Sequence, residues 1–138
     1  MKIYNVIIVE NDEDEQYFMR EGFEASGKFR IRAMVANGDE LLDWLGQHPT
    51  ELPDFILSDL NMPGRNGYDI ITDMRTTPAY SHMPVIITST SSTKTFIDKC
   101  LAFGAADYVV KPETFIEYRS FVDQLHGLIE EKGIVGGR

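Results

Sequence analysis

Four short apolar runs of this sequence each end in a side chain that could take part in chemistry. These side chains are Glu10, Asp59, Ser89 and Lys111. Carboxylate oxygens bind hard cations, a lysine ammonium pairs with carboxylates or phosphates, and a serine hydroxyl donates one hydrogen bond. If the fold brings the ends of these runs together, they form a site that can hold a cation beside an anionic group.

The segment ENDEDE, residues 10–15, places five carboxylates within six residues. Because like charges repel, this crowding needs a reason. Asn11 or Asp12 can cap a helix, and acids in the first turn of a helix favour its dipole by ~0.3–1 kcal/mol each. We therefore assign Glu10 to the candidate site and assign the four acids of residues 12–15 to the start of a helix.

The composition is that of an ordinary globular domain. The chain has 138 residues, 43% of them apolar, and a net charge of −9. No stretch reaches the roughly 18 apolar residues of a membrane span, and no charged-then-apolar leader opens the chain. A single cysteine, Cys100, excludes an internal disulfide, and we expect it to be a small buried side chain. Since there is no span, no leader and only one cysteine, we expect a cytoplasmic protein. The negative charge disfavours nucleic acid and anionic lipid, so we expect neither as a partner.

Strand-like runs alternate with helical patterns along the chain. The predicted strands are 3–9, 29–35, 54–60, 84–89 and 106–111, and the predicted helices are 12–26, 38–47, 68–77, 93–104 and 113–132. The apolar runs 56–57, 85–87 and 109–110 do not alternate with polar residues, as expected of strands covered on both faces.

This order predicts an α/β fold, a doubly wound, five-stranded parallel sheet with five helices. In such sheets ligands bind at the carboxyl ends of the strands, where the four side chains named above would meet. We assign residues 1–132 to one domain and residues 133–138 to a flexible tail.

Four motifs carry a family resemblance: VEND (9–12), LSDLNMPGRNG (57–67), PVIITS (84–89) and YVVKP (108–112). In this order they resemble the receiver domain of bacterial two-component response regulators. The resemblance covers roughly residues 3–130 and implies the flavodoxin-like topology of receivers. It also implies that the protein accepts a phosphoryl group on an aspartate from a histidine kinase, with Mg²⁺ present.

The resemblance assigns roles around this phosphoryl group. It implies that Asp59 is the phosphoacceptor and that Lys111 and Ser89 contact the phosphoryl oxygens. Ser89 and Tyr108 match the family's switch pair, in which the hydroxyl turns toward the phosphoryl group and the ring fills the space. The family also implies a cis peptide bond between Lys111 and Pro112.

The implied Mg²⁺ ligands are Glu10, Asn11, Asp59 and the backbone carbonyl of Asn61. Position 11 departs from the family, which usually has a metal-binding aspartate there. An amide oxygen can bind the ion but brings no charge, so we predict weaker Mg²⁺ binding and slower phosphorylation than in a typical relative. Asp12 is one residue away and points elsewhere.

The expected partners are a sensor histidine kinase or a histidine phosphotransfer protein, together with a downstream protein. Because the chain ends after the last predicted helix, we expect a stand-alone receiver that acts by binding proteins and is not an enzyme, apart from assisting its own phosphorylation and dephosphorylation. In the family the first helix meets the kinase. The surface of residues 93–132 is the usual docking face, and it could also form a homodimer.

Two alternatives remain. In a degenerate receiver, Asn11 would reflect binding of partners without phosphorylation. An unrelated flavodoxin-like enzyme or FMN carrier would need a phosphate-binding loop after the first strand, where the acidic residues 10–15 would repel phosphate. The sequence leaves open whether Arg65 and Asn66 control the access of water or of the phosphoryl donor.

Overall fold

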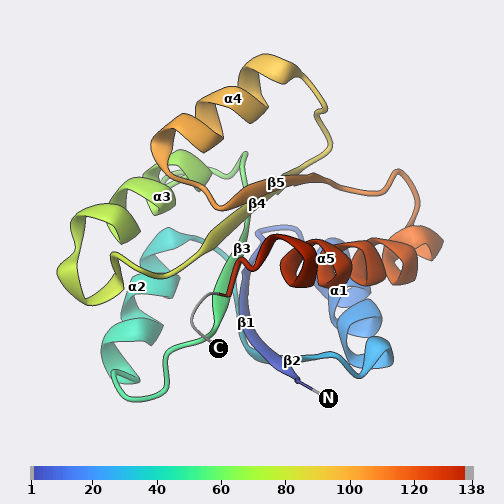
Figure 1. Cartoon of the computed structure of the whole chain (residues 1–138), viewed down its shortest axis with the longest axis horizontal. Helices are drawn as coiled ribbons and strands as arrows, with labels where there is room; N and C mark the ends of the chain where they lie inside the picture. Colours follow the sequence, from blue (N-terminus) through green and yellow to red (C-terminus); the bar gives the residue numbers. More distant parts are fainter. Residues whose placement is uncertain (1, 136–138) are drawn as a thin grey trace.

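The computed structural model describes residues 2–135 as five parallel strands in one sheet, ordered β2-β1-β3-β4-β5 (Figure 1). The strands are β1 (Tyr4–Val9), β2 (Phe29–Val35), β3 (Phe55–Asp59), β4 (Val85–Ser89) and β5 (Asp107–Val110). The helices are α1 (Glu13–Ser26), α2 (Gly38–Gln47), α3 (Gly67–Thr76), α4 (Lys94–Phe103) and α5 (Tyr118–Lys132), with 3₁₀ turns η1 (Pro78–Tyr80) and η2 (Phe115–Glu117). The predicted doubly wound α/β fold is confirmed.

The sheet is covered on both sides. Helices α1 and α5 pack on one face, whereas α2, α3 and α4 pack on the other (Figure 1). Successive residues of β1 alternate between the two cores: Ile7 belongs to the α2–α3–α4 side and Ile8 to the α1–α5 side, and both are fully buried. This two-sided burial explains why the strands read as unbroken apolar runs.

The helices begin and end where short polar residues and glycines allow. Asp12 caps α1 by accepting a hydrogen bond from the Glu15 N–H at 3.0 Å. Asn66 and Asp69 form a reciprocal capping box at the start of α3. Gly27 ends α1 with φ 69°, a left-handed conformation that favours glycine.

The structure differs from the prediction at the carboxyl-terminal end of the fold. Helix α5 begins at Tyr118 because residues 113–117 form a loop and the turn η2, so the predicted start at residue 113 is wrong. Val110 is 43% exposed because it is the last residue of the edge strand β5, although the prediction had it covered on both faces.

The predicted flexible tail is also different at its start. Ile134 and Val135 are half-buried against the α1–α5 core, and the Ile134 N–H donates to the Ile129 carbonyl at 3.1 Å. These two residues are therefore attached to the domain. Residues 136–138 of that tail lie outside the described residues.

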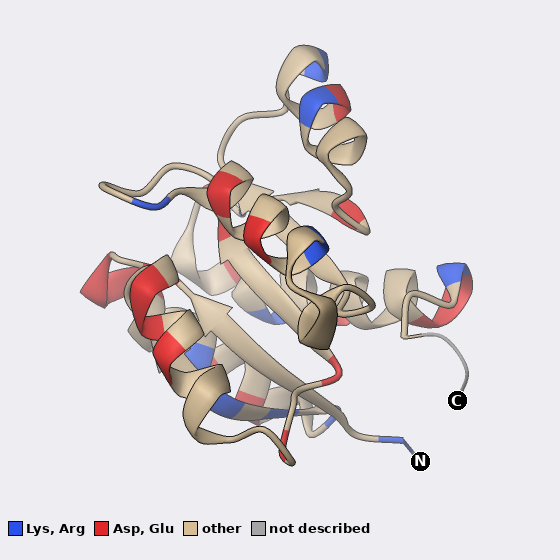
Figure 2. Ribbon diagram, turned by 90° about the vertical axis from the view of Figure 1, so that its left-hand side faces the viewer, with Lys and Arg blue, Asp and Glu red and all other residues tan. Residues whose placement is uncertain are grey.

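Two further properties bear on the expectations from composition. Cys100 is fully buried on α4, as predicted, and burial raises the pKa of its thiol. Acidic residues are spread over several elements of the face seen in Figure 2 rather than gathered at one place. Between residues 2 and 135 no helix combines the length and the apolar character needed to cross a bilayer.

Helix α3 begins in direct contact with the end of β3. The Gly67 N–H donates to the Leu60 carbonyl at 3.0 Å. A Cβ atom at Gly67 would lie 2.9 Å from the Asp59 carbonyl oxygen and 2.9 Å from the Leu60 Cα. Both neighbours are backbone atoms, which cannot move aside as a flexible side chain can. Only glycine therefore permits this approach.

We predict that Gly67→Ala lowers the free energy of unfolding by ~1–3 kcal/mol, because the added methyl group overpacks the junction of β3 and α3. Chemical denaturation measures this change. Gly127→Ala is the matched control: Gly127 lies in exposed helix with nothing within 4 Å of an added Cβ. That change should raise stability by ~0.5–1 kcal/mol through helix propensity. A Gly67→Ala protein as stable as the parent contradicts the prediction.

Candidate functional site

The carboxyl ends of β1, β3 and β5 bring three of the predicted side chains together. Side chains alternate between the two faces of a strand, so residues two apart share a face. Ile8, Leu57 and Val109 pack on the α1–α5 side. Glu10, Asp59 and Lys111 each come two residues later in the sequence than one of these three. Their side chains meet at the same edge of the sheet.

The Lys111 ammonium is the centre of this cluster. Its Nζ lies 2.7 Å from Glu10 Oε1 and 3.4 Å from Asp59 Oδ1. A third carboxylate, Glu15 Oε2, lies 2.5 Å from the same nitrogen. One cation therefore faces three acids, and this surplus of negative charge suits the approach of a further cation.

Burial sets the electrostatics of the cluster. The side chain of Glu10 is 1% exposed and that of Lys111 is 5% exposed. Burial raises the pKa of Glu10 to about 7, and the hydrogen bond from Lys111 offsets only part of that rise. Burial likewise raises the pKa of Asp59; Lys111 opposes this shift and the charge of Glu15 adds to it.

The pKa of Lys111 moves in the opposite sense from that expected of a buried amine. Burial alone would lower it, but hydrogen bonds to Glu10 and Glu15, together with the charge of Asp59, outweigh burial and raise it. Lys111 therefore stays positively charged at neutral pH, between the carboxyl groups of Glu10 and Asp59, whose pKa values are raised by burial.

The loop after β1 shows what the neighbouring polar residues do. The Asp12 N–H donates to Glu10 Oε2 at 3.0 Å, which fixes the orientation of the Glu10 carboxylate. The Asp12 side chain caps α1, so it points away from the cluster as expected. Asn11 and Asn61 are exposed; Asn11 follows Glu10 in the chain, and Asn61 comes two residues after Asp59.

Ser89 and Tyr108 lie on the other face of the sheet. Ile87 and Tyr108 belong to the α2–α3–α4 core, and Ser89 follows Ile87 by two residues. The Ser89 hydroxyl accepts a hydrogen bond from the Ser91 N–H at 3.2 Å, and the Tyr108 hydroxyl donates to the Ser91 carbonyl at 2.7 Å. Both members of the predicted switch pair therefore contact the loop between β4 and α4.

The peptide bond between Lys111 and Pro112 is trans, as are all peptide bonds among residues 2–135. The cis bond implied by the family resemblance is thus absent, and that expectation was wrong. The lysine is oriented instead by its carboxylate partners and by the hydrogen bond from its own N–H to the Ser89 carbonyl, at 2.7 Å.

The residues whose role the sequence left open are structural. Arg65 pairs with Asp39 on α2 at 3.0 Å and with Asp73 on α3 at 2.7 Å, so its guanidinium joins two helices. Asn66 caps α3. Each residue therefore makes contacts that stabilise the start of α3 or its packing on α2.

Sequence reasoning missed two residues of the site. Glu15 was assigned to the helix dipole alone, whereas its carboxylate reaches Lys111. Thr88 is aligned with Asp59 in the β3–β4 ladder and is buried, and its hydroxyl has no hydrogen-bond partner among the described residues. The alternation of side chains could have found Thr88, because it shares the face of Asp59.

The oxygen donors at this edge are of the kind that magnesium prefers. Mg²⁺ prefers oxygen ligands, commonly takes one or two carboxylates and keeps several waters. Glu10 and Asp59 both contact the Lys111 ammonium, so their carboxylates lie close to each other. Among the described residues no three or more His, Cys, Asp and Glu side chains form a ready-made metal cage. The expected set contains only two carboxylates and does not require such a cage.

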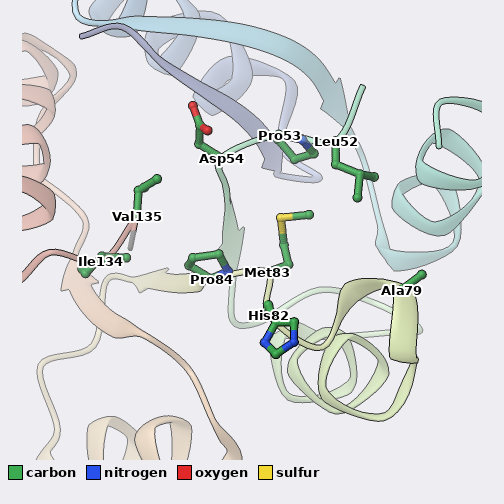
Figure 3. A pocket seen from close by; sticks show the side chains of 9 residues that line it. All are labelled: Leu52, Pro53, Asp54, Ala79, His82, Met83, Pro84, Ile134 and Val135. Carbon is green, nitrogen blue, oxygen red and sulfur yellow. The ribbon is translucent and has the colours of Figure 1, made fainter. Parts of the chain in front are cut away.

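A cavity of about 520 Å³ lies at the opposite edge of the sheet (Figure 3). Asp54 and Pro84, which line it, directly precede β3 and β4, whereas the Lys111 cluster lies where the strands end. Leu52, Met83 and Val135 give the cavity an apolar wall. It is separate from the acidic cluster and shares no residue with it.

Comparison with known proteins agrees with this geometry. The model of the family described as "Response regulator receiver domain" matches residues 6–123. The transcriptional regulatory protein MalR of Bacillus subtilis (strain 168) is 31% identical over 84% of this chain and 47% of its own length. The two-component response regulator ORR12 of Oryza sativa subsp. japonica is 38% identical over 46% of this chain and 53% of its own length. The chain thus spans about half the length of these curated relatives.

Solved structures show the same fold. The phosphorylated cyanobacterial phytochrome response regulator RcpA has a TM-score of 0.79 at 21% identity, covering 91% of this chain and 93% of that one. The Mn²⁺-bound form of response regulator Rcp1 has a TM-score of 0.76 at 18% identity, covering 90% and 92%. Because the family model matches residues 6–123 of the 138, the chain belongs to the response regulator receiver domain family.

Proposed function

We propose that this protein accepts a phosphoryl group on Asp59 and passes the signal on by binding other proteins. The observation that carries the proposal is the position of Asp59: its carboxylate is buried at the end of β3, 3.4 Å from the Lys111 ammonium. A carboxylate that only stabilised the fold would not need a buried cation from the end of β5 and a second acid from the end of β1 at the same edge.

The reaction moves a phosphoryl group from a donor to the carboxylate of Asp59. An oxygen of Asp59 attacks the phosphorus, a new P–O bond forms, and the bond from phosphorus to the donor nitrogen or oxygen breaks, so that the leaving group keeps the electron pair. Two unit negative charges about 4 Å apart repel by ~4 kcal/mol at an effective dielectric of 20. The Lys111 ammonium offsets part of this repulsion on the phosphoryl oxygens.

Glu10, Asp59, Asn11 and the Asn61 carbonyl would hold a magnesium ion beside the lysine. The bound ion would supply positive charge to the phosphoryl oxygens. Glu10 is oriented for this by the Asp12 N–H. Asn11 contributes a neutral oxygen, so the site binds the ion less tightly than one with an aspartate at that position.

Ser89 and Tyr108 would read the phosphorylation state. In the structure described here the Ser89 hydroxyl accepts from the Ser91 N–H, and Tyr108 donates to the carbonyl of the same residue. A phosphoryl group on Asp59 offers the Ser89 hydroxyl a charged acceptor, which forms a stronger hydrogen bond than a neutral one. When the hydroxyl leaves Ser91, the β4–α4 loop and Tyr108 rearrange.

The partners belong to two-component signalling. Receiver domains of such systems interact with histidine kinases or phosphotransfer proteins, and we propose one of these as the phosphoryl donor here. The proposed downstream surface is the α4–β5–α5 face, which could also form a homodimer. Apolar side chains exposed on α4 and β5, namely Phe96, Leu101 and Val110, support that choice.

The names of two neighbours of the same fold support the chemistry. RcpA was solved as a phosphorylated protein and Rcp1 with Mn²⁺ bound. The second candidate function is that of a receiver which binds its partners without phosphorylation, and the neutral Asn11 favours it. The buried arrangement of Asp59, Glu10 and Lys111 favours phosphorylation.

We predict that incubation with acetyl phosphate and Mg²⁺ adds one phosphoryl group to the protein, detected by intact mass. Asp59→Asn should abolish the adduct, because an amide is a poor nucleophile. Asp43→Asn, which removes an exposed carboxylate on α2, is the control and should leave the adduct unchanged. If neither small-molecule donors nor a kinase produces the adduct, the phosphorylation-independent function is the correct one.

We predict that Asn11→Asp tightens Mg²⁺ binding about tenfold, or ~1.4 kcal/mol, because it adds a carboxylate beside Glu10. Titration calorimetry on the unphosphorylated protein measures the affinity. Gln47→Glu adds the same charge at an exposed position of α2 and should have little effect. An unchanged or weaker affinity in Asn11→Asp would refute the assignment of position 11 to the ion.

A further inference from the structure

Glu15 is the closest partner of the Lys111 ammonium. Its Oε2 lies 2.5 Å from Nζ, compared with 2.7 Å for Glu10 and 3.4 Å for Asp59. Lys111 donates hydrogen bonds to Glu15 and to Glu10. The distance to Asp59 is longer than the usual 2.7–2.9 Å of a charge-assisted hydrogen bond. The lysine is thus held by the two glutamates rather than by the proposed phosphoacceptor.

The start of α1 explains why Glu15 is available for this contact. Asp12 and Glu15 have the spacing of a capping box, and the Asp12 side chain does accept from the Glu15 N–H. The return bond is not made, because the Asp12 N–H donates to Glu10 instead. The Glu15 carboxylate is therefore directed to Lys111, while its other oxygen accepts from the Tyr118 hydroxyl at 3.4 Å.

Tyr118 stabilises the position of the Glu15 carboxylate. Its ring is buried on α5, and both burial and the nearby Glu15 charge raise the pKa of its hydroxyl. The hydroxyl therefore stays protonated at neutral pH and remains a hydrogen-bond donor to Glu15. Contacts from both α1 and α5 thus place the carboxylate next to the lysine.

We propose that Glu15 is a positioning residue that holds the Lys111 ammonium away from Asp59 and gives it up when a phosphoryl group is bound. This inference rests on the proposed function of Asp59. An ammonium has three N–H donors; two are directed to the glutamates, and the third is left for Asp59, which lies 3.4 Å away. As Lys111 closes this distance to an oxygen on Asp59, we expect its contact with Glu15 to lengthen.

Exposure decides which glutamate is exchanged. The side chain of Glu10 is 1% exposed, so a Glu10 deprived of its cation must either take up a proton or remain a buried, unpaired charge. The side chain of Glu15 is 22% exposed, so water and Tyr118 can satisfy it after release. Glu15 is consequently the partner that a phosphoryl oxygen displaces, and it slows phosphorylation by competing for the lysine.

The test compares Glu15→Gln with Glu13→Gln at saturating Mg²⁺ and limiting acetyl phosphate, with adduct formation followed by intact mass. Both variants lose one acid from the first turn of α1, but Glu13 is exposed. Glu15→Gln should be phosphorylated about two- to fivefold faster than the parent, the size expected when a partly exposed ion pair no longer competes. Glu13→Gln should match the parent, which removes the helix dipole as the cause.

A double-mutant cycle with Lys111→Met shows whether the effect passes through the lysine. In that background Glu15→Gln should give no gain in rate, because the amine that the carboxylate would hold is missing. An equal gain with and without Lys111 means that Glu15 merely repels the anionic donor, and the inference is then wrong. A Glu15→Gln protein that unfolds as the parent does but is phosphorylated at the same rate or more slowly also overturns it.

The contact itself is measured without metal or donor. In a lysine-selective ¹⁵N spectrum, the Lys111 ammonium should show a changed shift and faster proton exchange in Glu15→Gln, but not in Glu13→Gln. An unchanged Lys111 signal contradicts the inference, whatever the phosphorylation result.

The phosphorylation results separate the inference from the proposed function. If the parent is phosphorylated and only the Glu15 effect fails, the proposed function stands alone. If no protein of the set forms an adduct, the proposed function fails and the inference fails with it. An adduct in Glu15→Gln alone supports both.

Discussion

The organisation of this receiver depends on one buried cation. A charge removed from water is costly unless partners surround it, and the Lys111 side chain is 5% exposed. Its partners come from β1, β3 and the first turn of α1, so three separate elements must be correctly placed before the ammonium is satisfied. The cluster therefore couples the order of the sheet to the position of α1, and it concentrates acids at the edge where phosphoryl chemistry is proposed.

Because side chains alternate along a strand, the proposed phosphorylation residues and the proposed switch residues lie on opposite faces of the sheet. Glu10, Asp59 and Lys111 project on the side of α1 and α5, while Ser89 and Tyr108 project toward α3 and α4. The backbone of β4 and β5 joins the two sets, because the Lys111 N–H donates to the Ser89 carbonyl. A change at Asp59 can thus reach the opposite face through adjacent strand ends, with no long pathway between them.

The sequence predicted the fold and the meeting of Glu10, Asp59 and Lys111, because both follow from rules that act locally or on topology: apolar periodicity, turn residues, and the convergence of parallel strand ends. It failed where tertiary contacts decide. Residues 113–117 have a helical pattern but form a loop and a 3₁₀ turn before α5 begins. Glu15 was explained by its own helix, so nothing in the local pattern required the contact with an amine 96 residues away.

The error over Glu15 has a physical lesson about acids at a helix start. The helix dipole favours a carboxylate in the first turn whatever else that side chain touches, so the local explanation is correct but incomplete. Exposure separates the two roles: Glu13 and Asp14 are open to solvent, whereas Glu15 is half-buried beside Lys111 and Tyr118. Position 11, next to Glu10, carries a neutral amide, and four residues later α1 directs a carboxylate to Lys111. The charge near the lysine is therefore set by the first turn of α1 together with the loop after β1, and under the proposed role of Glu15 that turn decides how readily the ammonium moves toward Asp59.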